Sequence, residues 1–351
     1  MDSNAYVKKE SKNRIRVDYE GKLSVKERLV KKFTTSNTWL KILISVFRFI
    51  MMLGISFVIL YPFIARIAGS FMSMEDVLDP TVNLIPRSPT FDIYKHLAID
   101  NHYFEAFLNT LLLSLLCALI QTFIACLVGY GMAKFKFKGN KLVMIAVVVT
   151  MIIPNSTLEL SMLQHFINFD LGHVIAWNYN SVLSLFNGGK GIYLMDSYWP
   201  LIILSFSGLA LKNGLYIYMM RQFFKGVPDE LEESAYVDGS GVFRTFIQII
   251  LPLSIPMMIT IFLFAFSWQW TDEFYTTTFF ISKENKMWLM PDIYVNVPND
   301  LLSVTNTSGN ATYSVIVRNT AGMMIIAPLV VMYIFCQRYL VQGIERSGLV
   351  G

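Results

Sequence analysis

Residues 106–132 read AFLNTLLLSLLCALIQTFIACLVGYGM, and this stretch decides the fold class. No charged side chain interrupts the sequence between Glu105 and Lys134. A helix that crosses a bilayer needs about 20 apolar residues, because the hydrocarbon core is about 30 Å thick. The apolar residues run continuously instead of alternating with polar ones, which favours a helix over a strand of a membrane barrel. The stretch therefore predicts a transmembrane helix.

The composition indicates that much of the remaining chain also lies in lipid. Of 351 residues, 54% are hydrophobic and 15% are charged, whereas soluble domains are about 25% charged. Six segments are long and apolar enough to span a membrane: Val46–Ala68, Ala106–Met132, Leu142–Met162, Trp199–Met220, Leu251–Trp270 and Thr320–Gln337. We therefore expect an all-α integral membrane protein with six transmembrane helices.

The placement of charge orients these helices. Residues 1–41 are rich in Lys and Arg, and the connection Lys134–Lys141 is short and basic. Such segments remain in the cytoplasm under the positive-inside rule. The connections within 69–105 and 271–319 are poor in basic residues, so we expect them outside. An even number of crossings then returns the C-terminus to the cytoplasm.

This topology divides the chain into three parts. Residues 1–41 form a basic cytoplasmic segment, residues 42–340 a transmembrane domain, and residues 341–351 a cytoplasmic tail. The connections assigned to the outside are long, and residues 168–196 are an example. Long loops without recognisable elements are usually functional or disordered, so these are either a docking surface for an outside partner or solvated connectors.

A short helix is predicted between the fourth and fifth membrane segments. Pro228 suits the first helical position. Asp229, Glu230 and Glu232 follow it, near the positive end of the helix dipole, where carboxylates are stabilised. Gly239 is placed to stop the helix, because glycine adopts a left-handed conformation without penalty. The result is a two-turn helix with an abrupt end, on the cytoplasmic side.

A second helix is predicted directly afterwards and continues into the fifth membrane segment at Leu251 and Pro252. Its apolar residues recur at helical spacing, namely Val242, Phe243, Phe246, Ile249 and Ile250. A helix–turn–helix joined directly to membrane helices can transmit a push as one body. The small side chains of Ser234 and Ala235 would let a partner's backbone approach closely. The alternative is an ordinary amphipathic connector on the membrane surface.

These residues resemble a known family. Glu233-Ser234-Ala235, then Asp238-Gly239 and the later Leu251-Pro252 pair, are similar to the EAA loop of bacterial ABC importer permeases; Ser234 replaces the usual alanine. The resemblance implies that the loop docks into a cleft on a separate ATP-hydrolysing subunit. It assigns ATPase coupling to Glu232, Glu233, Ser234, Ala235, Asp238, Gly239, Leu251 and Pro252.

Other stretches are similar to the maltose-permease-like carbohydrate group, among them Gly129–Phe135, Asn213–Tyr218 and Gln337–Gly343. The resemblance implies a type I ABC importer permease fold in a bacterial cell membrane. It also implies a second permease subunit, two ATP-binding subunits, an extracytoplasmic solute-binding protein and a carbohydrate substrate. ATP and Mg would bind the partner ATPase and no cofactor would bind this chain. Gln342 and Gly343 become a candidate C-terminal contact with the ATPase.

Polar and aromatic residues within or beside apolar segments are candidates for a translocation path: Asn155, Glu159, Asn213, Trp268 and Trp270. Aromatic faces suit sugar rings, and amides or carboxylates suit hydroxyl groups. The tryptophans are equally consistent with an interfacial belt, and Glu159 with a water-facing helix end. Lys212, beside Asn213, either snorkels to water or pairs with an acid of a partner subunit.

Other classes of function have weaker support in the sequence. No GxxxxGK[ST] phosphate loop is present, so ATP hydrolysis must come from another chain. No HExxH or GxSxG arrangement indicates an enzyme, and the cysteine spacing matches no metal site. His165 and His173 are either metal ligands or solvated loop histidines, and the sequence favours the second reading. Nucleic acid is not an expected partner. The remaining alternative is an ion- or proton-coupled secondary transporter, for which only Glu159 offers an intramembrane acid.

Overall fold

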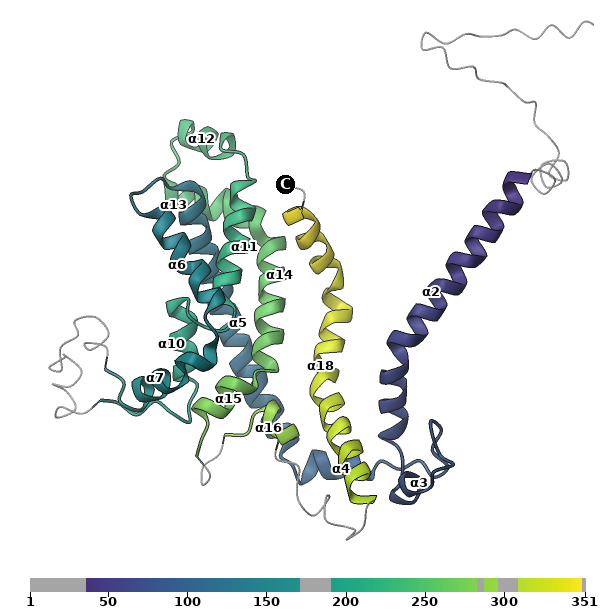
Figure 1. Ribbon diagram of the computed structural model, residues 1–351. Coiled ribbons are helices and arrows are strands. Elements are labelled where there is room, and N and C mark those ends of the chain that lie inside the picture. Colours follow the sequence, from purple (N-terminus) through teal and green to yellow (C-terminus); the bar gives the residue numbers. More distant parts are fainter. Residues whose placement is uncertain (1–35, 171–190, 283–286, 296–308, 349–351) are drawn as a thin grey trace, which may run out of the picture. The chain divides into compact units, whose positions relative to one another are not determined.

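The computed structural model describes residues 36–170, 191–282, 287–295 and 309–348. Within these ranges the secondary structure is helical, apart from a bridge between Phe169 and Ile192 (Figure 1). The all-α class is therefore confirmed. The chain divides into two compact units, residues 1–65 and residues 66–351, and each is described by itself.

The first unit is dominated by α2 (Ser36–Gly69), which continues a few residues into the second. Residues Trp39–Gly69 are long and apolar enough to cross a membrane. Arg66 lies in the last turn, where a cation interacts favourably with the negative end of the helix dipole. The expected segment Val46–Ala68 is thus confirmed and lies inside a longer helix.

Three further helices in the second unit are long enough to span. They are α5 (Tyr103–Lys134), α18 (Gly309–Gly348), and α14 (Leu251–Trp270) together with the turns that precede it. These turns are α13 (Val242–Thr245) and the π-helical η1 (Phe246–Ile250), so the apolar span starts at Val242. The second, fifth and sixth expected segments are therefore confirmed. The expected boundary between residues 340 and 341 falls inside α18.

The third expected segment is helical but sharply bent. It consists of α6 (Asn140–Ile152) and α7 (Asn155–Ile167), which meet at 100°. Pro154 lies at the bend; it has no N–H to donate, and its ring disfavours helical geometry at Ile153. The continuous helix expected over Leu142–Met162 is therefore wrong. The pair forms either one broken span or a re-entrant loop.

The fourth expected segment, Trp199–Met220, is not a continuous helix. It is split into α10 (Trp199–Ser207) and α11 (Asn213–Lys225), neither of which is long enough to cross a bilayer by itself. Gly208 and Lys212 both have left-handed backbones, with φ of 74° and 62°. Among the described residues there are four spanning helices, or five if the bent pair counts as one. The expected number of six spans is therefore not confirmed.

The core of the second unit forms around α5, which packs against α10, α11 and α14, while α14 also packs against α18. Gly129 permits the closest approach of α5 to α11, because a Cβ atom built there would lie 2.6 Å from the Cβ of Met220. Trp270 is fully buried, and its indole N–H donates to the carbonyl of Ile325 at 2.9 Å. This bond ties the end of α14 to α18.

Short helices occupy both ends of the second unit (Figure 1). At one end lies α12 (Glu230–Val237); at the other lie α4 (Asp92–Ile99), α15 (Glu273–Phe279) and α16 (Met290–Val295). The connections expected outside thus contain helices, including α3 (Met74–Leu78). Buried bonds hold them to the bundle: Asn101 Nδ2 donates to the carbonyl of Ile293, and Met290 N–H donates to the Thr110 hydroxyl.

The start of α15 holds a buried carboxylate. Asp272 caps the helix by accepting the N–H of Tyr275 at 3.1 Å. Burial raises the pKa of Asp272 to about 7, although backbone hydrogen bonds oppose the shift. Because the folded-state pKa exceeds the ordinary 3.8, the folded protein binds this proton more tightly than the unfolded chain does. The free energy of unfolding therefore falls as pH rises between these two values, and levels off above them.

We predict that Gly129→Ala lowers the thermal stability of the purified protein, whereas Gly131→Ala does not. Overpacking a tight contact costs about 1–3 kcal/mol, and a Cβ atom at Gly131 would meet no other atom within 4 Å. Both substitutions add the same methyl group to α5 and gain the same helix propensity. Thermal unfolding in detergent measures the difference, and equal midpoints for the two variants would contradict the close contact.

We predict that Asp272→Asn is more heat-stable than the wild type at pH 8, and that the difference shrinks as pH falls towards 5. The amide oxygen keeps the cap to Tyr275, while the cost of burying a negative charge disappears. Thermal unfolding of both proteins across this pH range measures the effect. A stability difference that does not change with pH would show that Asp272 does not titrate as described.

Candidate functional site

The first candidate site is the end of the second unit that carries α12. Glu230 is its first helical residue, and Asp229 occupies the N-cap. The position predicted for Pro228, first in the helix, is therefore wrong: it lies one residue before the cap. Gly239 has a φ of 80°, and the N–H of Ser240 donates to the carbonyl of Ala235 at 2.9 Å. The predicted glycine stop is confirmed.

From Val242 onward the chain is helical without interruption into the membrane span. Gly241 precedes α13, η1 continues it, and α14 follows directly at Leu251. The π-helical turn η1 is wider than an α-helical turn and accommodates one extra residue inside the helix without ending it. The predicted second helix is therefore confirmed, and α12 is one sharp turn away from a helix that runs to Trp270.

An ionic clamp holds α12 to the end of α5. The ammonium of Lys134 donates to the carbonyl of Val227 at 2.6 Å and to Asp229 Oδ1 at 2.5 Å, and lies 3.7 Å from Glu232 Oε1. Tyr130 donates to the other oxygen of Glu232 at 3.4 Å. The hydrogen bond and the charge of Lys134 lower the pKa of Asp229. We call Tyr130, Lys134, Asp229 and Glu232 the α5–α12 clamp.

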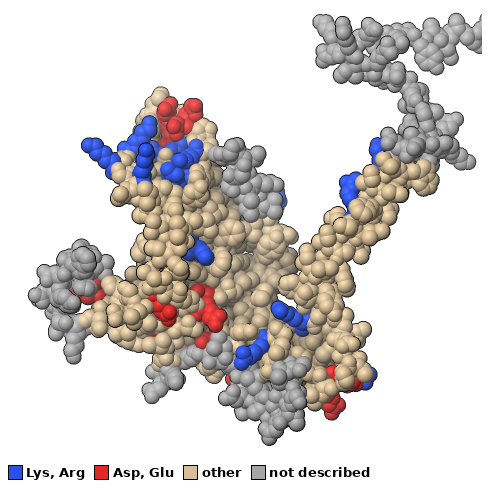
Figure 2. Space-filling model, in the orientation of Figure 1, with Lys and Arg blue, Asp and Glu red and all other residues tan. Residues whose placement is uncertain are grey.

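The predicted coupling residues on α12 lie on two faces of the helix, one packed against the clamp side and one exposed. Glu232 and Ala235 are buried against their own chain, so they hold the helix in place. Glu233, Ser234 and Asp238 are exposed. Figure 2 shows acidic side chains gathered at this end of the molecule with Lys and Arg beside them. Any partner of α12 therefore meets the face that carries the exposed residues.

The remaining predicted coupling residues lie on α14 and α18. Leu251 is half-buried and Pro252 exposed, at the start of α14. Gln342 and Gly343 lie in the last turns of α18, where the structure describes the backbone only. Lys134 and Tyr130 were not selected from the sequence, where Lys134 served only as a signal of topology. Their alignment with α12 depends on the packing of α5.

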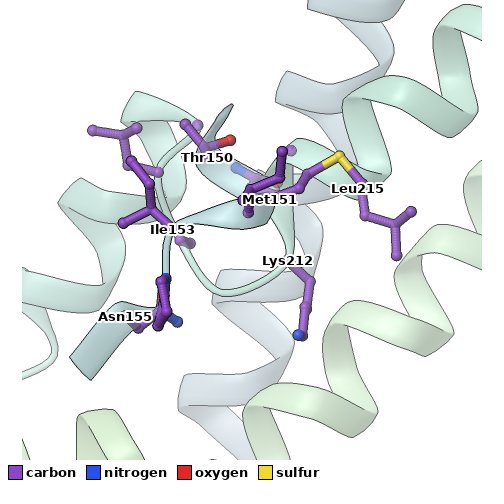
Figure 3. A pocket seen from close by; sticks show the side chains of 13 residues that line it. Thr150, Met151, Ile153, Asn155, Lys212 and Leu215 are labelled. Carbon is purple, nitrogen blue, oxygen red and sulfur yellow. The ribbon is translucent and has the colours of Figure 1, made fainter. Parts of the chain in front are cut away.

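The second candidate site is a pocket between the two helix breaks, α6/α7 and α10/α11 (Figure 3). Its volume is about 260 Å³. It brings together Asn155, from the start of α7, and Asn213, from the start of α11. Gly214 lets the two breaks meet, because a Cβ atom there would lie 2.6 Å from Thr150 Oγ1. The sequence did not identify Gly214 as a site residue, because its contact with Thr150 joins residues that lie far apart in the chain.

Among the described residues, the amide of Asn213 is a polar group of the pocket that has no hydrogen-bond partner. Asn213 is fully buried, yet neither its amide nitrogen nor its amide oxygen has a hydrogen-bond partner. Most buried polar atoms in proteins are paired, because an unpaired one costs about 1–3 kcal/mol. The ammonium of Lys212 lies 5.0 Å from the centre of the Trp268 ring, a cation–π distance.

Three of the predicted path residues do not line this pocket. Glu159 is exposed on α7, and Trp270 is buried in the core by its bond to Ile325. Trp268 is half exposed and reaches the pocket only through Lys212. Within the described ranges, no group of three or more His, Cys, Asp or Glu side chains is placed to hold a metal ion; His173 lies outside these ranges.

Comparison with known proteins identifies relatives over most of the chain. The family described as binding-protein-dependent transport system inner membrane component matches residues 121–346. A galactooligosaccharides transport system permease protein of Bacillus subtilis, GanQ, is 25% identical over 87% of this chain and 95% of its own length. The arabinooligosaccharides permease protein AraQ of the same organism is 27% identical over 86% of this chain and 94% of its own length.

A solved structure shares the fold. It is a bacterial ABC transporter involved in the import of the acidic polysaccharide alginate. The matched chain is 18% identical, with a TM-score of 0.60, over 85% of this chain and 96% of that one. At this identity the likeness concerns the fold, which agrees with the helical architecture described above.

We predict that Lys134→Gln loosens α12 without unfolding the bundle. The variant leaves Glu232, whose side chain is 11% exposed, without its nearby cation. Backbone amide exchange in residues 230–238, measured by hydrogen–deuterium exchange, should become about tenfold faster, as for a lost charge-assisted hydrogen bond.

Lys138→Gln removes an exposed charge from the same connection and is the matched control. It should leave exchange in α12 unchanged. Equal exchange in both variants and the wild type would show that the clamp does not restrain the helix.

Proposed function

This chain belongs to the family of binding-protein-dependent transport system inner membrane components, and from that membership we propose how it works as the permease subunit of an ABC importer. It forms part of the path for a carbohydrate and receives force from a separate ATPase. The observation that supports this reading most directly is α12, which ends at Gly239 with a left-handed turn and leads directly into the helix that continues as α14.

The carbohydrate class rests on relatives and on the pocket. The names of two relatives include galactooligosaccharides and arabinooligosaccharides, and both relatives align over most of this chain. The amides of Asn155 and Asn213 line one cavity, and an amide both donates and accepts hydrogen bonds, as sugar hydroxyls require. A carbohydrate, most simply an oligosaccharide, is therefore the substrate we propose.

The proposed assembly contains further subunits. A second permease chain completes the path, two ATP-binding subunits dock on the cytoplasmic side, and a solute-binding protein delivers substrate from outside. ATP and Mg bind the ATPase subunits. Both termini of this chain are cytoplasmic, and the broken pairs α6/α7 and α10/α11 contribute to six crossings. The basic charge of residues 1–41 and 134–141 supports this orientation.

The proposed mechanism is alternating access driven through α12. The exposed Glu233 and Ser234 contact the ATPase, whose closure on ATP moves α12. Because α13, η1 and α14 are continuous, this displacement passes into the bundle as a rigid-body motion. The α5–α12 clamp passes it to the central helix at the same time. Hydrolysis then resets the helices.

An ion- or proton-coupled secondary transporter is the alternative mechanism. It would use an intramembrane acid that gains and loses a proton. Glu159, the candidate acid, is exposed on α7 and does not line the pocket. Co-purification of an ATPase with the full chain distinguishes the two mechanisms, because only the importer needs one.

We predict that Gly239→Asp reduces carbohydrate uptake and stimulation of ATP hydrolysis about fivefold or more while the protein still inserts into the membrane. A non-glycine residue at a left-handed position costs about 1–2 kcal/mol, which displaces α12 from its docked position. The added carboxylate lies beside Asp238 and repels it.

Gly241→Asp is the matched control, because it adds the same charge two residues away where φ is −77°. Its extended backbone accepts a side chain, and aspartate is a favourable N-cap for α13. Uptake should be retained in this variant. Wild-type uptake in Gly239→Asp, or equal losses in both variants, would contradict a coupling role for the turn.

A further inference from the structure

We propose that the pocket between the two helix breaks binds a sugar ring that carries a carboxylate, so that the carbohydrate moved by this permease is acidic. The inference rests on the proposed transport function and narrows its substrate class to uronic-acid-containing saccharides. It is drawn from the charge and hydrogen-bonding capacity that surround one cavity, formed by Asn155, Lys212, Asn213 and neighbouring residues.

Two helices begin at this cavity. Asn155 is the first residue of α7 and Asn213 the first residue of α11, and both residues line it. Neither helix has a side chain that caps its start. The N-terminal end of a helix carries about half a positive charge. At α11 the N–H groups of Asn213 and Leu215 already donate to the carbonyls of Ala210 and Lys212, so this start contributes mainly its partial charge. The two starts therefore make the cavity attractive to an anion.

The ammonium of Lys212 adds a full positive charge. Lys212 lines the cavity, and none of the other lining residues is an Asp or Glu. Among the described residues, no carboxylate lies within 4.0 Å of this ammonium. Glu159 lies one turn further along α7, is exposed, and does not line the cavity. Positive charge therefore accumulates around the cavity, and none of the described lining residues carries a negative charge to balance it.

A neutral sugar would leave the positive charge around the cavity without a counter-charge. Lys212 is exposed in this chain, and charged side chains at membrane depth usually mark a transport path. A carboxylate on the ligand supplies the missing charge and accepts hydrogen bonds from an ammonium and from backbone N–H groups. The charge distribution of the cavity thus favours an anionic ligand over a neutral one.

The remaining groups suit the rest of a sugar ring. Asn213 is fully buried and has both a free donor group and a free acceptor in its amide, the pair that a ring hydroxyl satisfies. In Figure 3, Asn155 and Lys212 extend in the same direction from the two breaks. The Trp268 face lies beside the Lys212 ammonium. A hydroxyl-binding amide and a cation therefore line one cavity, and an aromatic face contacts the cation from outside the lining.

The size of the cavity limits what it holds. Its volume of about 260 Å³ is just below the usual range of ligand pockets, about 300–1,000 Å³. The two breaks are in close contact at one wall, where a Cβ atom on Gly214 would lie 2.6 Å from Thr150 Oγ1. One ring of an oligosaccharide fits this description better than a whole chain does.

The test uses the complete importer, this chain with its partner permease and ATPase subunits, in lipid nanodiscs without the solute-binding protein. The probes are 1,4-linked digalacturonate and the digalactoside made by reducing both of its carboxylates, which keeps linkage and hydroxyl pattern. Isothermal titration gives the Kd of each. The expected result is at least tenfold tighter binding of digalacturonate at low salt, with a preference that falls as ionic strength rises.

Three variants identify the source of the preference. Lys212→Gln should weaken digalacturonate binding about tenfold and leave the digalactoside Kd within about twofold. Lys212→Arg keeps the charge and should retain the preference. Lys225→Gln, at the opposite end of α11, is the matched control and should change neither value.

The outcomes separate this inference from the proposed function. Equal binding of both disaccharides, or a preference unchanged in Lys212→Gln, overturns the acidic assignment while the carbohydrate importer stands. If neither disaccharide binds, and neither they nor neutral oligosaccharides stimulate ATP hydrolysis when the solute-binding protein is added, the proposed function fails and the inference fails with it.

Discussion

The close contact between α5 and α11 at Gly129 is the constraint on which both candidate sites depend. The backbone of α11 lies so near α5 that a single methyl group at Gly129 would collide with Met220. One end of α11 opens onto the pocket, and its other end leads through Val227 to α12. A tight contact near the middle of a short helix therefore sets the position of both ends, because a helix behaves as a stiff rod over this length.

Short helices at the two ends are secured by different forces. The α5–α12 clamp uses charge, with Lys134 as its centre, and its Glu232 is removed from water by the surrounding bundle. The opposite end relies on buried neutral hydrogen bonds, such as the one from Asn101 to the carbonyl of Ile293. In the proposed mechanism, this charged clamp passes a displacement of α12 to α5 and leaves the apolar core intact. The pocket lies between these two ends, where the amide of Asn213 has no hydrogen-bond partner among the described residues.

Much of the architecture could be predicted from residue types. The apolar runs that became α2, α5, α14 and α18 were recognisable because lipid imposes a minimum length of uninterrupted apolar sequence. The turn at Gly239 was recognisable because few other residues adopt a positive φ cheaply. The fourth expected span was wrongly predicted as a continuous helix, because that prediction relied on hydropathy alone. Hydropathy averages over the left-handed residues Gly208 and Lys212, and lysine gives no warning of such a backbone.

The sequence by itself determined the all-α class and the end of α12, and it selected Asn155 and Asn213 as candidates for a polar path. These properties follow from hydropathy, glycine and proline, which act locally on the chain. Only the tertiary structure decided that Asn155 and Asn213 share a cavity, that Trp270 belongs to the core, and that Lys134 holds Asp229 and Glu232. These contacts join residues far apart in sequence, and their partners depend on how helices pack, which residue types alone do not specify.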